Sequence, residues 1–142
     1  MNWQWWLKLE YRGLCQKILE SVPNIRDVFI VNSEARLVAF SGAEDAMQIN
    51  EAQLAELMED LLFMVSSRRH YENLFGTFQY MHIKHRRTDT FVLPFERDNL
   101  LCICLKADEH DDAEFIHKVE DILVSIYKYA WNMQCQNTKD SK

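Results

Sequence analysis

Apolar residues recur along the chain with two spacings, one typical of helices and one typical of strands. They return every three or four positions over residues 3–19, over a segment that begins after Asn50, and over residues 112–133, which predicts three amphipathic helices. Between these segments lie short runs rich in β-branched and aromatic residues, which predict strands. The predicted order of elements is therefore α-β-β-α-β-β-β-α.

The five predicted strands differ in what surrounds them. The first two are separated only by the polar residues 32–35, so we expect a β-hairpin, in whose turn Asn32 could tolerate a left-handed backbone. The last strand is apolar on both faces, which predicts a central position in the sheet. The predicted strands cover residues 27–32, 36–41, 76–85, 90–94 and 100–105.

Two of the helices begin with recognisable capping residues. Asn50 can accept a backbone N–H at the start of the second helix, with Gln53 as its capping-box partner, and Asp111 and Glu114 have the same spacing before the third. The apolar stripe of the second helix is widened by residues 62–64. Such a wide stripe predicts contacts on two sides of this helix.

The third predicted strand has no plainly polar side. Unless another chain pairs with it, such a strand would leave an exposed edge prone to aggregation. Its two histidines lie three positions apart and so point to opposite faces, which spoils chelation, and we expect no metal site. Alternation places Phe78, Tyr80 and His82 on one side and Met81 and Ile83 on the other.

The composition is that of an ordinary globular protein. The chain has 142 residues, 48% of them hydrophobic, with three glycines and two prolines, which predicts long regular elements. We expect one domain over residues 1–134 and a polar, flexible tail over residues 135–142. Four cysteines are too few for a disulfide scaffold, which favours a reducing, cytoplasmic compartment. No apolar run is long enough to span a bilayer.

The charge is unevenly distributed along the sequence. The net charge of −6 argues against a general nucleic-acid binder. Between Arg68 and Arg97, however, cations outnumber anions by six to three. We expect Lys84, Arg86 and Arg87 to dock an acidic protein surface, with a solvated loop as the alternative.

Three tryptophans stand at the start of the first helix, at Trp3, Trp5 and Trp6. Tryptophan favours the membrane interface, but near the three tryptophans only Lys8 and Arg12 supply positive charge. We therefore favour packing of the tryptophans on the domain or on a partner over a membrane surface.

The sequence contains no recognisable catalytic constellation. No serine or cysteine lies in a nucleophile motif, and phosphate-loop and dinucleotide fingerprints are absent from the sequence. Cys102 and Cys104 share one face of an apolar strand, where cysteines are usually small core residues. We expect no enzyme activity, no catalytic residues and no cofactor.

The order of elements, together with these segments, resembles the Roadblock/dynein light chain domain, which is related to the longin and profilin-like folds. The resemblance covers about residues 10–133 and rests on the hairpin 28–41, the capped helix after Asn50 and the strand pair 91–105. Longins begin directly with the hairpin, so the N-terminal helix favours Roadblock. The turn 32–35 departs from the family in lacking the glycine that often stands there.

The resemblance implies an α+β fold with a five-stranded antiparallel sheet, the first and third helices on one face and the second on the other. It also implies dimerisation through the second helix and the third strand, so that two sheets become one. The residues of these two elements that we expect at the interface are Leu61, Met64, Val65, Phe78, Tyr80, Met81, His82 and Ile83.

The resemblance also implies a function. Roadblock proteins act as scaffolds or regulators of small Ras-like GTPases without doing chemistry themselves. The leading hypothesis is a non-enzymatic adaptor that dimerises with itself or with a second Roadblock-like chain and binds a small GTPase or a larger complex. The alternative is a profilin-like sensory domain that holds a small ligand between helix and sheet.

Overall fold

A computed structural model describes residues 3–43, 48–96, 98–107 and 111–125, and the side chains from residue 10 onward. The chain divides into one compact unit up to Ala107 and a second from Asp108. The second unit contains a helix over residues 112–125. The first unit contains α1 (Trp3–Ser21), β1 (Ile25–Val31), β2 (Leu37–Gly42), α2 (Glu51–Arg69), α3 (Glu72–Phe75), β3 (Met81–Lys84), β4 (Thr88–Phe95) and β5 (Asn99–Lys106).

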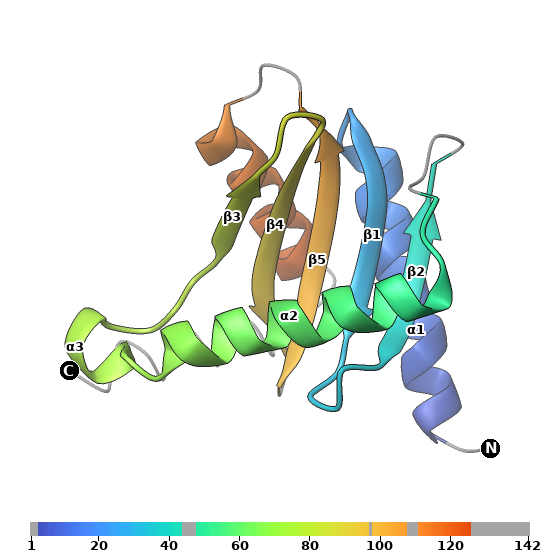
Figure 1. Ribbon diagram of the computed structural model, residues 1–142. Coiled ribbons are helices and arrows are strands. Elements are labelled where there is room, and N and C mark those ends of the chain that lie inside the picture. The colour runs from blue at the N-terminus through green and yellow to red at the C-terminus, as the bar shows by residue number, and fades with distance from the viewer. Residues whose placement is uncertain (1–2, 44–47, 97, 108–110, 126–142) are drawn as a thin grey trace. The chain divides into compact units, whose positions relative to one another are not determined.

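The strands form one five-stranded antiparallel sheet in the order β2-β1-β5-β4-β3 (Figure 1). β5 lies in the middle, as its two apolar faces predicted, and β2 and β3 form the edges. α2 crosses one face of the sheet, whereas α1 lies on the other face against β1 and β2. The α+β fold predicted from the sequence is confirmed.

Each face of the sheet has its own apolar core. On the α2 face, side chains from β1, β4 and β5 pack against the inward stripe of α2. On the other face, Leu14, Cys15 and Ile18 of α1 are buried. The buried members of the α2-face core are Phe29, Val31, Met58, Leu61, Val65, Val92, Leu100, Cys102 and Cys104.

Both predicted helix caps are present. The Asn50 side chain accepts the Gln53 N–H at 2.8 Å, and the Gln53 side chain accepts the Asn50 N–H at 3.3 Å. At the start of the helix over 112–125, the Glu114 N–H donates to Asp111 Oδ1 at 3.1 Å. The rest of the predicted third helix, up to residue 133, and the predicted tail over 135–142 lie outside the described residues.

The turn between β1 and β2 forms in an unexpected way. The Asn32 side chain accepts the N–H groups of Glu34 and Arg36, each at 3.0 Å, and the Asn32 N–H donates to the Arg36 carbonyl. The left-handed residue is Ala35, with φ 61°, rather than Asn32. Asn32, which could have tolerated this conformation, instead shapes the turn through its side-chain oxygen, which accepts these two backbone N–H groups.

The third predicted strand is shorter than the sequence indicated. Only its second half, Met81–Lys84, pairs with β4, and its start is preceded by the short helix α3. Gly76 ends α3 at φ 89°, and the Phe78 N–H donates to Glu72 Oε2 at 2.7 Å, so this N–H is not available for a strand ladder. As a result Phe78 packs on the α2 face with Met81 and Ile83, and the prediction that it shares a side with His82 was wrong.

The side chains of Trp3, Trp5 and Trp6 at the start of α1 lie outside those described, so their packing stays a prediction. Among the described helices, none combines the length and apolar character that crossing a membrane requires.

Candidate protein-interaction surface

The open edge of the sheet at β3 is the first part of the candidate surface. Among the described strands, β3 pairs with β4 alone, so one row of its backbone groups faces away from the sheet. Met81 and Ile83 are half-buried and pack against the α2-face core, while Tyr80 beside them is exposed. An edge strand with apolar flanks is a template for pairing with another chain.

The predicted interface residues in the second half of α2 differ in burial. Leu61 and Val65 are buried in the core of the chain itself, against the sheet. Met64 is half-buried, and Phe63, which the prediction did not include, is 75% exposed. Of the predicted residues on α2, Met64 is therefore the one that the structure brings to the surface.

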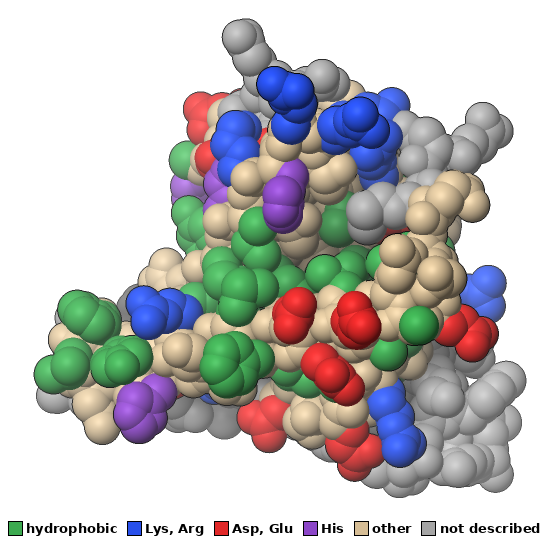
Figure 2. All heavy atoms as spheres, viewed as in Figure 1, with side chains coloured by type: hydrophobic (Ala, Val, Ile, Leu, Met, Phe, Trp, Pro, Cys, Tyr) green, Lys and Arg blue, Asp and Glu red, His purple; other side chains and the backbone are tan. Residues whose placement is uncertain are grey.

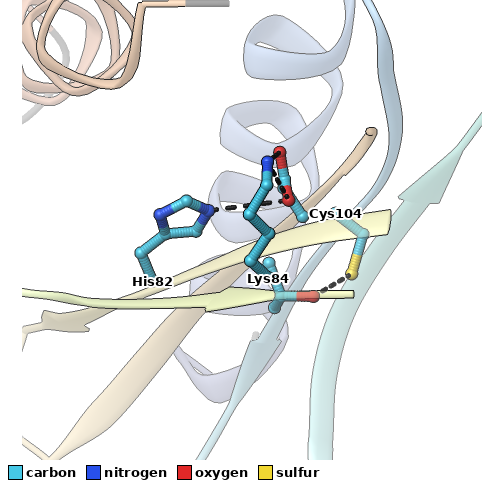
Figure 3. A network of polar contacts seen from close by, with 5 residues as sticks. His82, Lys84 and Cys104 are labelled. Carbon is cyan, nitrogen blue, oxygen red and sulfur yellow. Dashed lines mark hydrogen bonds and ion pairs between the residues drawn. The ribbon is translucent and has the colours of Figure 1, made fainter. Parts of the chain in front are cut away.

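His82 and Lys84 lie on the side of β3 that faces away from α2, and both point toward the buried Asp89 of β4 (Figure 3). Lys84 Nζ lies 3.4 Å from both carboxylate oxygens of Asp89, and His82 Nε2 lies 3.7 Å from Oδ1. The His82 ring stacks on Phe91 with centroids 4.3 Å apart. Lys84 is directly opposite Asp89 in the ladder, so this cluster holds β3 on β4.

Positive side chains gather at the tip of the β3–β4 hairpin (Figure 2). Arg86 and Arg87 are exposed, and the Ala107 N–H donates to the Arg87 carbonyl, which brings the tip beside Lys106 at the end of β5. Lys84 keeps 69% of its side chain exposed although its ammonium group reaches Asp89. The predicted docking residues therefore lie together on one basic end of the sheet.

The outer side of α2 carries the opposite charge. Figure 2 shows acidic side chains over this helix, on the same face of the molecule as the basic end. Positive and negative surfaces are thus separated, which orients an approaching charged partner. The exposed acidic residues of α2 are Glu51, Glu56, Glu59 and Asp60.

The three described cysteines are free and buried. Burial raises the pKa of Cys15 to about 12 and that of Cys104 to about 11, and it raises the pKa of Cys102 as well. Such thiols remain protonated and are poor nucleophiles. The prediction that Cys102 and Cys104 are core residues is confirmed.

The histidines whose side chains are described do not form a metal site with their described neighbours. Within the described ranges, no group of three or more His, Cys, Asp or Glu side chains is arranged to hold a metal ion. His85 is exposed at the hairpin, whereas His82 faces Asp89.

One part of the surface was missed from the sequence. α3 exposes Leu74 and Phe75, and Tyr71 just before it is exposed as well. A four-residue helix is too short to show a periodic pattern. The available signal was the density of large apolar residues immediately before Gly76.

The fold places the chain among Roadblock-like structures. The described structure has the Roadblock/LC7 fold, and it is similar to the Roadblock/LC7 domain from Streptomyces avermitilis, with a TM-score of 0.65 and 14% identity over 84% of this chain and 97% of that one. The gliding protein MglB from Thermus thermophilus gives 0.66 and 13% identity over 84% and 89% of the two chains. MglB from Myxococcus xanthus gives 0.65 and 15% identity over 85% and 90%. No protein-family model and no curated protein matches the sequence.

Proposed function

We propose that this protein is a non-enzymatic adaptor that associates through β3 and the adjoining surface of α2, with itself or with a second Roadblock-like chain. In this associated state it recruits or regulates a small Ras-like GTPase or a larger complex. The observation that carries the proposal is the outer edge of β3, which pairs with no further strand among those described and is bordered by apolar side chains from both elements.

Pairing two β3 edges would continue the sheet from one subunit into the next. It would satisfy the outward backbone groups and cover Met64, Tyr80, Met81 and Ile83 in one step. Phe63 would border the same interface from α2. One of the similar structures is of MglB in a tetrameric arrangement, which supports association of chains with this fold.

The basic end of the sheet is the proposed docking site for the partner. Arg86 and Arg87 are exposed there, and Lys84 lies beside them, which suits an acidic protein surface. The GTPase as partner follows from the Roadblock resemblance.

The buried carboxylate and the buried thiols serve the fold in this proposal. Asp89 anchors β3, and the buried thiols pack in the core. Free cysteines also suit the reducing cytoplasm, where we place the protein.

The proposal is tested first by sedimentation equilibrium over a range of concentrations. We expect a species of about 34 kDa, twice the 17.0 kDa of the chain. The associated protein is then used to capture purified small GTPases loaded with GDP or with a GTP analogue. A monomer at every concentration that captures no GTPase would contradict the proposal. A stoichiometric small molecule seen by native mass spectrometry would favour a sensory domain instead.

A further inference from the structure

The short helix α3 and the residue before it carry the most exposed cluster of large apolar side chains among the described residues. Phe75 is 83% exposed and Leu74 is 76% exposed, and α3 has no buried residue. Tyr71 is exposed next to them. We call these three side chains the α3 patch. Clustered exposed apolar residues on a folded chain mark a contact with something else.

α3 has a defined structure although it buries none of its apolar residues. Glu72 accepts the Phe78 N–H at 2.7 Å and lies 3.5 Å from the Arg69 guanidinium. The Arg68 guanidinium lies 5.4 Å from the centre of the Tyr71 ring. Polar and cation–π contacts therefore fix α3 to the end of α2. The Phe75 ring lies 6.5 Å from the Tyr71 ring, measured between centroids, and the polar contacts of Glu72 do not involve the Leu74 or Phe75 side chain.

The position of α3 explains why its own sheet does not cover it. α2 runs across the sheet and past the edge strand β3, and α3 lies at its far end beyond that edge (Figure 1). Figure 2 shows hydrophobic side chains gathered there and others along the seam between α2 and β3. A chain that extends the sheet from β3 would occupy the space beside α3.

We propose that the α3 patch is a clasp that seats Leu74 and Phe75 on a second copy of this chain. This inference rests on the proposed association through β3. The occupant is a second copy because the patch lies beyond the outer edge of β3, which no other described strand pairs with. Residues 76–80 connect the patch to that edge, and Phe78 among them packs against the α2-face core. Under two-fold symmetry each subunit gives and receives one clasp.

The first test compares two surface variants by sedimentation equilibrium. We expect Leu74→Ser with Phe75→Ser to raise the dissociation constant of the dimer at least about tenfold, since central aromatic and aliphatic anchors dominate binding energies. The matched control is Phe40→Ser on the opposite edge strand β2, where Phe40 is 44% exposed, and it should leave the constant unchanged. Circular dichroism confirms that each variant is folded.

The second test locates the contact directly. p-Benzoylphenylalanine in place of Phe75 keeps an aromatic ring, and irradiation should join two chains. A mixture of isotopically light and heavy protein shows by mass spectrometry that the cross-link is between copies. The same probe at position 40 should give no such adduct.

The outcomes separate the clasp from the proposed function. If Ile83→Lys in β3 abolishes the dimer while the α3 variant and the probe at position 75 show no effect, association through the edge stands and the clasp is wrong. A cross-link confined to one chain also overturns the clasp. If the unmodified protein is monomeric and the probe joins no second copy, both association through β3 with a second copy and the clasp fall.

Discussion

Ala35 is an alanine in a backbone conformation that favours glycine. Its φ of 61° places it in the left-handed region, which costs most residues about 1–2 kcal/mol. Its methyl group packs partly against the α2-face core, so replacing it loses some contact. We expect Ala35→Gly to raise the free energy of unfolding by about 0.5 kcal/mol, measured by denaturation in urea. The control is Ala55→Gly at an exposed position of α2, which should lower the free energy of unfolding by about 1 kcal/mol. If both variants changed the free energy of unfolding in the same direction, this account would be contradicted.

The buried thiols predict a loss of stability in alkali. Burial raises the pKa of Cys15 from 9.0 to about 12 and that of Cys104 from 9.0 to about 11. Above pH 9 the unfolded chain releases these protons while the folded chain keeps them, so the free energy of unfolding falls as pH rises toward 11. The slope is up to about 1.4 kcal/mol per pH unit for each thiol.

This slope can be separated from the titration of lysines and tyrosines by comparing variants. Cys104→Ala should flatten the dependence of the unfolding free energy on pH between 9 and 11, whatever its effect on stability at about pH 7. A variant curve parallel to that of the unmodified protein would refute the assignment to Cys104.

The β3 edge provides the prediction at the level of elements. Ile83 packs half-buried at this edge, directly opposite Thr90 of β4. We expect Ile83→Lys, and equally Met81→Lys, to weaken self-association at least about tenfold, because each brings a charge to the proposed pairing edge. Analytical ultracentrifugation measures the effect. Thr77→Lys, at an exposed position outside the strand, is the control, and if it weakens association as strongly, the effect is not specific to the edge.

Most elements could be predicted because their signals are local. Asn50 and Gln53 form a capping box that marks the start of α2. The residues of β5 are apolar on both faces, which requires a strand covered on both sides. The start of β3 could not be predicted in this way, since it depends on a side chain of Glu72 that accepts the Phe78 N–H from six residues away. The left-handed backbone of Ala35 could not be predicted either, because it depends on hydrogen bonds that the Asn32 side chain makes within the turn.

The candidate surface was predicted less well than the fold. Periodicity identified α2 as unusually apolar, but it could not tell that Leu61 and Val65 face their own sheet while Phe63 faces outward. That division depends on how α2 crosses the strands, which is a property of tertiary packing. The basic residues of the hairpin tip were found from charge alone, because a turn between strands is exposed wherever the sheet lies.

At the scale of the whole molecule, the separated charges predict salt-sensitive capture of the partner. Arg86→Glu with Arg87→Glu should reduce capture of an acidic partner, and the difference from the unmodified protein should shrink as salt increases. Binding rates at several ionic strengths, measured by surface plasmon resonance, test this. The control is Arg12→Glu with Lys17→Glu, at two exposed positions on α1, which changes the net charge by the same amount. An effect of the same size in the control would point to net charge rather than to the hairpin tip.

The central place of β5 also shapes how the chain folds during synthesis. β1 needs β5 as its inner neighbour, yet β5 begins about seventy residues after β1 ends. At about 5–20 residues per second, the ribosome leaves the β1–β2 hairpin without that neighbour for roughly 3–14 s. During this interval Phe29 and Val31 are open to chaperones and to other nascent chains, so contacts distant in sequence govern the folding rate. Slower translation between residues 31 and 99 would lengthen that exposure and reduce the yield of folded protein.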